Sequence, residues 1–531
     1  MGRYFIYGLF LIFSAGIIPL KAQSLQQNFA AGSYIINMGE RPQTHKNALK
    51  AYGLLYDLLQ NHEVDIKWII NPDKEKDGID FSCGEKDYRS GAFLVPVSYV
   101  TQEVENTFNS WQEKGVVIQK SKEDLLLPVF TSLTIPPRWT LDKENGYIAV
   151  PFFKAAEIPP SAYGGSRVAG WKKPSELGVC DDIFVLPHAD PKFDSHKNLY
   201  YWNQKYKGAI WAGCHAASIL ENLFGPKEDS EELIQLNFLS AGFPGARSAG
   251  LVHFREHRHG TPPYKNTFPS DPVAQYLGNP DKAHLNGSER IFFPKRINKW
   301  RSGAKVLVLD PDAPDIPEIS SGEAAISIYG HGFDNPANGL VMYQAGHNIY
   351  GETEAHVAAM RAFFNWSFYA TEIKRKENLV SFKSRDSNKR NVGAKIGDDL
   401  TDILNLDPIH FDLDEYIIRD KVKPQLTEIA EFMLKNPAIL LDIRSHTDSR
   451  ANDTYNQQLS EDRVEATRNF LIELGVEGYR ISGRGYGETE PVNKCKNKVP
   501  CSEKKHEANR RSEFILSIDC RIYNQEEELR L

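Results

Sequence analysis

Short apolar segments alternate with longer stretches of helical periodicity over most of this 531-residue chain, up to about residue 370. Helices are predicted at 45–61, 101–114 and 354–368, the first from leucines at helical spacing. Buried strands are predicted at 34–36, 64–70, 93–97, 183–186, 209–212, 305–309, 324–329 and 340–344. Such alternation is typical of a parallel sheet covered by helices on both faces. We therefore expect an α/β domain over residues 23–370.

A change of composition at residue 371 indicates a linker. Residues 371–395 are rich in Lys, Arg, Ser and Asn, as in a solvated segment. Beyond them, apolar residues alternate at 409–413 and 439–443, helical stripes cover 426–433 and 464–474, and further strands begin near 481 and 514. This β-α-β-α-β-β order predicts a compact α+β sandwich over residues 396–531. The chain is longer than one core usually organises, which agrees with two domains.

The N-terminus has the features of a secretory signal. Arg3 precedes an apolar run that ends at Leu20, and Ala22 is a small residue at the exit. We predict a signal peptide over residues 1–22, with a single membrane span as the alternative. Export would place the protein in the cell envelope. The formal net charge of −7 gives no electrostatic reason to expect a nucleic-acid partner.

Export would also allow disulfides to form among the six cysteines. Cys495 and Cys501 lie close together around a Lys-rich loop that contains a proline. We expect a bridge between them, with two free surface thiols as the alternative. Elimination then pairs Cys83 with Cys180.

Several ordered motifs occupy roughly the last quarter of the chain. They are Arg444-Ser445-His446-Thr447-Asp448, then Asn456, Leu459-Ser460 and Arg463, then Gly483-Arg484-Gly485-Tyr486-Gly487, then Asn509-Arg510-Arg511. With the expected order of strands and helices, these residues resemble the OmpA-like peptidoglycan-binding domain. The resemblance implies a periplasmic protein associated with the outer membrane, with peptidoglycan as its partner.

The residue types in these motifs suit a zwitterionic ligand. Peptidoglycan stems of many envelopes carry meso-diaminopimelate, whose free end bears an ammonium and a carboxylate on one carbon. Asp448 can accept hydrogen bonds from the ammonium, and Arg463 can donate two parallel hydrogen bonds to the carboxylate. The resemblance implies the same two roles, and the alternative is that Asp448 and Arg463 only pair with each other. It also implies further pocket residues, namely Thr447, Asn456, Leu459 and Arg510.

Two positions depart from the family pattern. Ser445 and Ala451 stand where the family usually has glycine, before the histidine and three residues after the aspartate. If position 451 requires a positive φ, an alanine there is strained by roughly 1 kcal/mol. The loop after Asp448 is therefore expected to be reshaped.

Another motif lies in the N-terminal part, where residues 209–217 form an apolar strand that turns through small residues into a helix. Cys214 stands at the turn, the position of a nucleophile elbow, and His347 follows a later strand. This arrangement resembles the class I glutamine-amidotransferase-like fold. The resemblance implies Cys214 as nucleophile, His347 as base and Glu352 or Glu354 as acid. Against it, the family's flanking glycines are alanines here, and a buried structural cysteine is the alternative.

Two more features concern the N-terminal part. Residues 47–54 and 89–95 resemble uncharacterised α/β domains of Bacteroidetes-type envelope proteins, a likeness that implies no reaction. His253, His257 and His259 are close enough in sequence to hold zinc, but the arginines between them would repel a dication. We therefore predict no metal site and no cofactor.

These expectations lead to one function and one alternative. We predict a noncovalent peptidoglycan-binding envelope protein that anchors an α/β domain to the cell wall. Other envelope or outer-membrane proteins are the expected partners of the α/β domain. The alternative is a Cys-dependent amidase or amidotransferase-like hydrolase, which tethering to the wall would hold near its substrate.

Overall fold

The structure, a computed structural model, describes residues 25–518 except for 41–46, 63, 166–169, 179, 228–231, 242–261, 285–290, 295–298, 314–319, 378, 383–391, 396 and 497–498. The predicted signal peptide at 1–22 lies outside the described residues, as do His253, His257 and His259. Among the described helices, none combines the length and the apolar character needed to cross a membrane.

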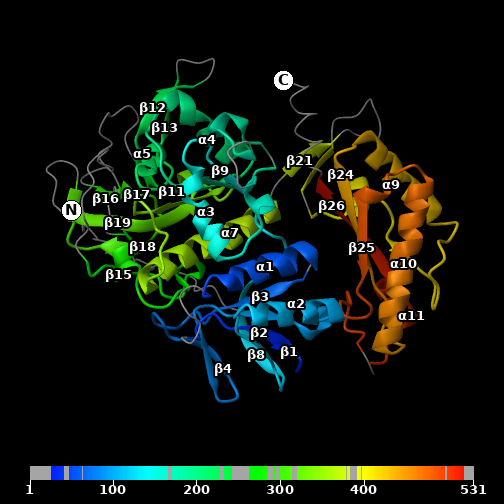
Figure 1. Cartoon of the computed structure of the whole chain (residues 1–531). Helices are drawn as coiled ribbons and strands as arrows, with labels where there is room; N and C mark the ends of the chain where they lie inside the picture. The colour runs from blue at the N-terminus through cyan, green and yellow to red at the C-terminus, as the bar shows by residue number, and fades with distance from the viewer. Residues whose placement is uncertain are drawn as a thin grey trace, which may run out of the picture.

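The first layer of the molecule is a six-stranded sheet in the order β1-β8-β3-β6-β2-β7. Its strands are β1 (Leu25–Phe29), β2 (Tyr34–Ile36), β3 (Ile66–Ile69), β6 (Phe93–Val95), β7 (Ile118–Lys120) and β8 (Leu125–Leu133). Helices α1 (Lys50–Asn61) and α2 (Gln102–Glu113) lie beside this sheet (Figure 1). Thr101 caps α2, because its hydroxyl accepts a hydrogen bond from the Val104 amide.

All pairings in this sheet are antiparallel, so the parallel sheet predicted for 34–36, 64–70 and 93–97 is wrong. The strands β2 and β3, which α1 connects, do run in the same direction. However, β6 is inserted between them and runs against both. The alternation of strands and helices predicts the crossover but not an inserted strand, which here follows the hairpin of β4 (Ile79–Cys83) and β5 (Lys86–Arg89).

A second, eight-stranded sheet has the order β15-β18-β19-β20-β11-β10-β9, with β16 paired to β19. Its strands are β9 (Trp139–Leu141), β10 (Ile183–Leu186), β11 (Ala209–Gly213), β15 (Lys265–Asn266), β16 (Ile291–Pro294), β18 (Lys305–Asp310), β19 (Ser320–His331) and β20 (Leu340–Gln344). The neighbours β9, β10, β11 and β20 are parallel, whereas β15, β16, β18 and β19 pair antiparallel. The parallel prediction therefore holds for this half of the sheet alone.

Helices cover both faces of the second sheet. In Figure 1, α4 (Phe193–Lys205) and α5 (Ala216–Glu221) lie on one side and α7 (Glu354–Glu377) on the other. The shorter elements of this part are α3 (Val150–Ala155), β12 (Leu223–Pro226), β13 (Leu233–Leu236), β14 (Ser240–Ala241), α6 (Asp281–His284) and β17 (Lys299–Trp300).

Helix α7 joins the two sheets into one core. The hydroxyl of Tyr52 on α1 donates to Oδ1 of Asn365 (2.7 Å), and Nε1 of Trp139 on β9 donates to the hydroxyl of Ser367 (3.0 Å). Phe363 and Phe364 on α7 are fully buried in the same cluster as residues of both sheets. The N-terminal part is therefore built around a shared helix.

The boundary predicted between the N-terminal part and the linker, at residue 371, lies too early in the sequence. Helix α7 continues to Glu377, and the strands β21 (Leu379–Phe382) and β22 (Val392–Lys395) pair as a hairpin. Two charged residues in the helical stretch are buried instead of solvated. Lys374 pairs with Asp182 at 3.0 Å, and the carboxylate of Glu372 accepts from the Thr134 amide. These partners lie far away in sequence, so local composition did not indicate them.

The C-terminal part follows the predicted β-α-β-α-β-β order, with two added short helices, α8 before β23 and α11 between β25 and β26. Its elements are α8 (Leu400–Leu404), β23 (Ile409–His410), α9 (Lys423–Lys435), β24 (Ile439–Ser445), α10 (Asp453–Glu473), β25 (Ile481–Gly485), α11 (Glu503–Asn509) and β26 (Arg511–Ile518). The sheet order is β23-β26-β24-β25. The strand expected over 409–413 is shorter than predicted, and Leu413 is exposed beyond its end.

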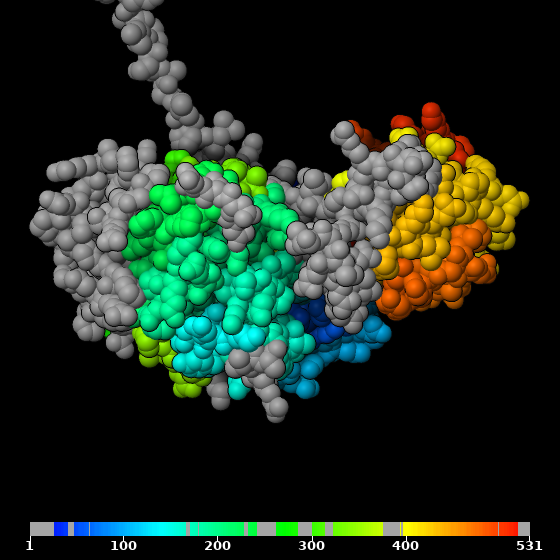
Figure 2. All heavy atoms as spheres, turned by 90° about the horizontal axis from the view of Figure 1, so that it is seen from above, coloured from blue at the N-terminus to red at the C-terminus, as the bar shows by residue number. Residues whose placement is uncertain are grey.

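The two parts of the chain lie side by side, as Figure 2 shows in cyan to green and in yellow to red. At one contact, the hydroxyl of Tyr99 donates to Oε1 of Glu490 (3.1 Å). The guanidinium of Arg484 lies 5.7 Å from the centre of the Tyr99 ring. Tyr206 also packs against the C-terminal core.

The described cysteines differ from the expectations in one respect. Cys495 and Cys501 form a disulfide, with their Cα atoms 5.9 Å apart. Cys83 is a free thiol, whereas Cys180 is disulfide-bonded, so the pairing of Cys83 with Cys180 is wrong. Elimination failed because it assumed that all six cysteines form disulfides, whereas Cys214 is in none.

Candidate functional site

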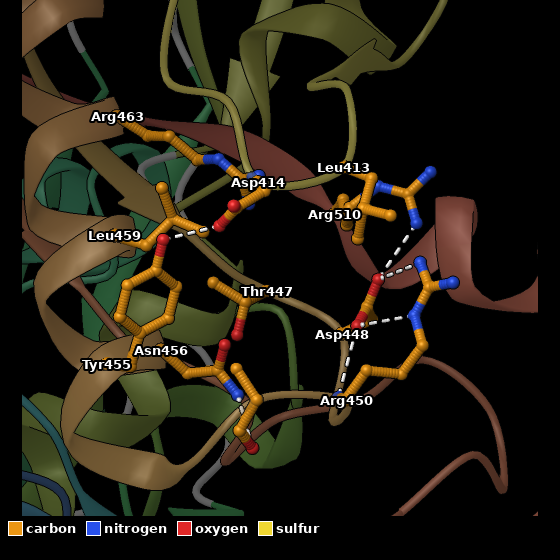
Figure 3. Close-up of a pocket in the computed structure, with 11 residues that line it drawn as sticks. Leu413, Asp414, Thr447, Asp448, Arg450, Tyr455, Asn456, Leu459, Arg463 and Arg510 are labelled. Atoms are coloured by element: carbon orange, nitrogen blue, oxygen red, sulfur yellow. Dashed lines mark hydrogen bonds and ion pairs between the residues drawn. The ribbon is translucent and has the colours of Figure 1, made fainter.

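A pocket of about 520 Å³ opens in the C-terminal domain where β24 ends and α10 begins (Figure 3). The turn after β24, the first turns of α10 and the loop after β23 form its walls. Its lining residues are Leu413, Asp414, Thr447, Asp448, Arg450, Ala451, Tyr455, Asn456, Leu459, Arg463 and Arg510. The fold thus brings all six residues named from the sequence to one pocket.

Two guanidinium groups hold the carboxylate of Asp448. Arg450 donates from Nε to Oδ1 (3.1 Å) and from Nη2 to Oδ2 (2.7 Å), and Arg510 donates from Nη1 to Oδ2 (2.8 Å). Burial raises the pKa of the Asp448 carboxyl, but the hydrogen bonds from both arginines outweigh burial and lower this pKa to about 2. The pocket therefore contains a carboxylate at neutral pH.

The guanidinium of Arg463 is fully buried and binds main-chain carbonyls. It donates to the carbonyl oxygens of Glu415 (2.9 Å), His446 (2.9 Å) and Asp412 (3.1 Å). Burial lowers its pKa to about 10, so the group stays charged at neutral pH. A guanidinium has more N–H groups than these three bonds use, which leaves donors for a ligand. Within the described chain, Arg463 and Asp448 form no ion pair with each other.

Three more of the predicted residues complete the walls. The Thr447 hydroxyl is buried and has no hydrogen-bond partner among the described residues. Such a group costs about 1–3 kcal/mol, which a ligand in the pocket would relieve. The side-chain amide of Asn456 donates to the carboxylate of Glu488. Leu459 supplies an apolar wall from the next turn of α10.

The sequence analysis did not predict three polar residues of this pocket, Arg450, Asp414 and Tyr455. Arg450 donates two hydrogen bonds to the Asp448 carboxylate. In the sequence, only the separation of two residues between them indicated this pair. Asp414 lies beside Arg463 in Figure 3, and its carboxylate accepts from the Tyr455 hydroxyl. Nothing in the local pattern indicated Asp414, because residues 411–413, which precede it in the loop after β23, were expected to be part of a strand.

The two departures from the family pattern are accommodated without strain in the described chain. Ala451 is not among the non-glycine residues with positive φ, so the strain expected at that position is absent. Ser445 ends β24, where it is buried and its hydroxyl bonds to that of Ser512.

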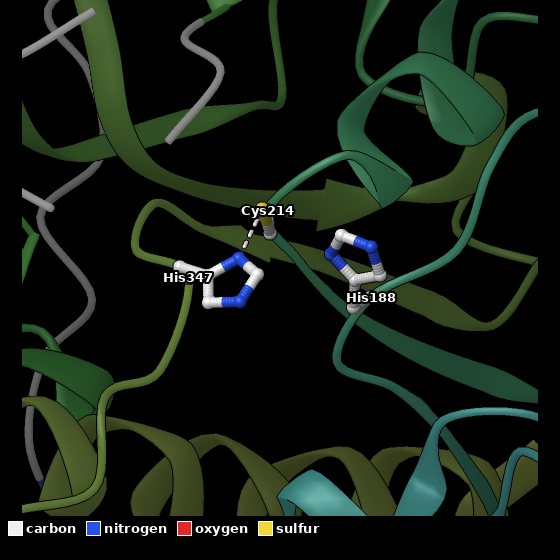
Figure 4. A group of neighbouring side chains, drawn as sticks. All are labelled: His188, Cys214 and His347. Carbon is white, nitrogen blue, oxygen red and sulfur yellow. Dashed lines mark hydrogen bonds between the residues drawn. The ribbon is translucent and has the colours of Figure 1, made fainter. Parts of the chain in front are cut away.

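The elbow predicted at Cys214 lies between β11 and α5. Cys214 has φ 46°, a left-handed conformation that is uncommon for a side-chain-bearing residue. Its Sγ is 3.4 Å from Nδ1 of His347, and His188 is the third member of the group (Figure 4). Cys214 and His347 therefore meet at the predicted elbow, and the role of Glu352 or Glu354 as the acid stays a prediction.

Comparison with known proteins concerns the C-terminal part. Residues 410–505 match the model of the OmpA family. Over 85 residues the chain is 40% identical to outer membrane porin F of Pseudomonas aeruginosa, which covers 16% of this chain and 24% of the porin. Over 89 residues it is 36% identical to the peptidoglycan-associated lipoprotein of Brucella melitensis, covering 17% of this chain and 53% of that protein.

Among solved structures, the peptidoglycan-associated lipoprotein of Burkholderia pseudomallei is 27% identical, with a TM-score of 0.20, and covers 22% of this chain and 92% of that chain. The chain spans about a quarter of the porin and about half of the Brucella lipoprotein. The C-terminal domain is thus OmpA-like, and its relatives are consistent with an envelope location near the outer membrane.

Proposed function

We propose that this protein binds peptidoglycan noncovalently through the pocket around Asp448 and Arg463, and thereby anchors its N-terminal part to the cell wall. One observation carries the proposal: a carboxylate and a buried guanidinium, both charged at neutral pH, line one pocket of an OmpA-like domain. They do not pair with each other, and the charge of Asp448 becomes available to a ligand when Arg450 leaves it.

The chemistry of the pocket favours the free end of meso-diaminopimelate. This end carries an ammonium for the Asp448 carboxylate and a carboxylate for the free N–H groups of Arg463. The buried Thr447 hydroxyl supplies a further hydrogen-bonding group. Arg450, whose side chain is 35% exposed, has room to leave Asp448 when the ammonium arrives. Arg510 would remain, because its side chain is only 6% exposed and also donates to the Phe411 carbonyl.

The relatives support the same ligand class by their names, which include peptidoglycan-associated lipoproteins. The matched regions cover 16–17% of this chain, so the relatives give no information on the N-terminal part. Its contact with the C-terminal domain at Tyr99 and Glu490 would hold it near the wall. We propose that it positions another envelope component there.

Competition between two stem tripeptides tests the proposed ligand. The full-length chain is sedimented with purified peptidoglycan that contains diaminopimelate, in the presence of either free peptide. The peptide L-Ala-γ-D-Glu-meso-diaminopimelate should release the protein. The matched peptide that ends in L-lysine lacks the second carboxylate and should not. If both peptides compete equally, or neither does, the pocket does not recognise the zwitterion.

The hydrolase alternative is favoured by the left-handed turn at Cys214 and its 3.4 Å contact with His347. A nucleophilic thiol of this kind also requires a group that orients the histidine, a role that the alternative gives to Glu352 or Glu354. Hydrolysis of stem peptides by the full-length chain, lost in Cys214→Ser, would support this alternative over the binding role alone.

A further inference from the structure

Three neighbouring strands of the second sheet end at one place. The strands β10, β11 and β20 are parallel and adjacent, so their carboxyl ends lie at the same edge of the sheet. His188 follows β10 by two residues, Cys214 follows β11 directly, and His347 follows β20 by three. Ligand sites of α/β sheets form at this edge, where loops of neighbouring strands converge.

Close backbone packing brings these loops together. A β-carbon added at Gly213 would lie 2.8 Å from the carbonyl oxygen of Pro187, so only glycine permits the ends of β10 and β11 to approach this closely. Gly346, at φ 119°, turns the chain after β20 toward the same place. Both glycines directly precede a residue of the cluster. The sequence is therefore adapted to place Cys214 and His347 together.

The resulting cluster has the dimensions of a metal site. The Sγ of Cys214 is 3.4 Å from Nδ1 of His347, and one ligand atom of His188 lies within 4.8 Å of both. The rings of His188 and His347 are 5.1 Å apart and stand at 73° to each other, so they do not stack face to face (Figure 4). Ligands of a tetrahedral zinc ion, each about 2.0–2.3 Å from the metal, have similar separations.

We propose that His188, Cys214 and His347 bind one divalent metal ion of the zinc class. A thiolate and two imidazoles form a borderline-soft donor set, which favours zinc over magnesium or calcium. Cys214 is fully buried, His188 is half-buried and His347 is exposed, so the ion would have a protected ligand and an open side. Three protein ligands and an open side leave a fourth position for water or a ligand.

A second group overlaps the first and offers a different position for the ion. Asp190, His215 and the shared His188 also have ligand atoms within 4.8 Å of one another. In this group, Nδ1 of His215 is 3.5 Å from Oδ1 of Asp190. The first group is preferred because it includes the buried thiol, which as a thiolate gains most from a soft cation. The two positions predict opposite effects of replacing His347 and His215.

Cobalt and zinc binding by the purified full-length chain tests the proposal. One equivalent of Co²⁺ should produce a thiolate-to-cobalt absorption band in the near ultraviolet, and zinc should displace it. Cys214→Ser should abolish the band, and His347→Ala should weaken Co²⁺ affinity by roughly 100-fold or more, since loss of an outer group alone costs about 10–100-fold. His215→Ala should leave both intact.

Matched controls separate loss of a ligand from loss of the fold. Cys83→Ser removes a thiol outside the cluster and His356→Gln removes a histidine outside it, so both should bind Co²⁺ as the parent does. Circular dichroism identifies any variant that fails to fold. A parent chain without the band would overturn the proposal. So would a His215→Ala variant that loses the metal while His347→Ala keeps it. Peptidoglycan sedimentation of the same variants should be unchanged, since the wall pocket is in the other domain.

Discussion

The carboxylate of Asp448 and the guanidinium of Arg463 line one pocket, yet within the described chain neither is the ion-pair partner of the other. Asp448 is bonded to Arg450 and Arg510, and Arg463 is bonded to main-chain carbonyls. Once Arg450 leaves Asp448, a negative and a positive group are available within one cavity. A ligand that carries both charges on a single carbon can therefore engage them together.

Replacing Asp448 by asparagine removes the negative charge while the size of the side chain is kept. We expect Asp448→Asn to lose sedimentation with peptidoglycan, because an amide cannot balance the ligand's ammonium. Asp442→Asn is a matched control: Asp442 also pairs with an arginine, Arg444 at 2.8 Å, but does not line the pocket. If Asp448→Asn binds as well as Asp442→Asn does, Asp448 has no part in recognition.

Arg463 has a structural role as well as the proposed one, and Arg480 allows the two to be separated. Arg480 is also buried, and it donates to the carbonyls of Ile439, Met433 and Asn436, away from the pocket. Lysine cannot satisfy three carbonyls in this geometry. Each carbonyl left unsatisfied costs about 1–3 kcal/mol. We therefore expect Arg463→Lys and Arg480→Lys to lower the free energy of unfolding by several kcal/mol alike, as measured by urea denaturation.

Only the Arg463→Lys variant should also lose peptidoglycan binding, provided that both variants are assayed below their unfolding midpoints. Equal loss of binding in the two variants would mean that Arg463 acts through stability alone.

Much of the C-terminal domain follows from local pattern. Ile439, Leu441 and Ile443 alternate in the sequence and are buried along β24, and the stripe at 426–433 is the buried face of α9. The residues at the ends of these elements then have little freedom. For this reason the motif positions converge on one pocket, including Asp448 and Arg463.

The parts that were not predicted depend on contacts between distant segments. Strand β6 enters the first sheet between β2 and β3, and no local periodicity specifies the neighbour of a strand. Lys374 lies in a segment with the composition of a solvated linker, but it is buried against Asp182, the residue directly before β10. Arg450 was missed for a different reason. An arginine that binds a neighbouring carboxylate cannot be distinguished from an exposed surface arginine by its local sequence.

The acid stability of the C-terminal domain should depend on His446. Burial lowers the pKa of its imidazole to about 3, with repulsion from Arg511 and Arg444 as lesser causes, against an ordinary value of 6.5. The unfolded chain therefore takes up a proton that the folded chain excludes. The contribution of His446 to the free energy of unfolding is fully present above about pH 6.5. It is lost as the pH drops toward 3, by up to about 1.4 kcal/mol per pH unit.

We expect His446→Phe to remove this part of the acid dependence in denaturation experiments between pH 7 and pH 4. The phenyl ring can keep the stacking on Tyr486, whose ring centre is 5.3 Å away. Neither ring nitrogen of His446 has a hydrogen-bond partner in the described chain. Besides the titrating group, the variant loses one contact, between Nε2 and the Glu513 carboxylate at 3.8 Å. Parallel pH profiles for the parent and the variant would contradict this assignment.

The disulfide between Cys495 and Cys501 supports the turn that carries Asp448. The hydroxyl of Ser449 donates to the Cys495 carbonyl at 3.0 Å, which joins the disulfide loop to the residue after Asp448. Closing a loop with a sequence separation of 6 stabilises the folded chain by about 2 kcal/mol in the chain-entropy account. The Cys495→Ser/Cys501→Ser variant should therefore unfold at a lower temperature and bind peptidoglycan more weakly. Cys83→Ser, which removes a free thiol, should change neither property. An unchanged melting temperature in the double variant would show that contacts such as the one at Ser449 hold the loop without the covalent bond.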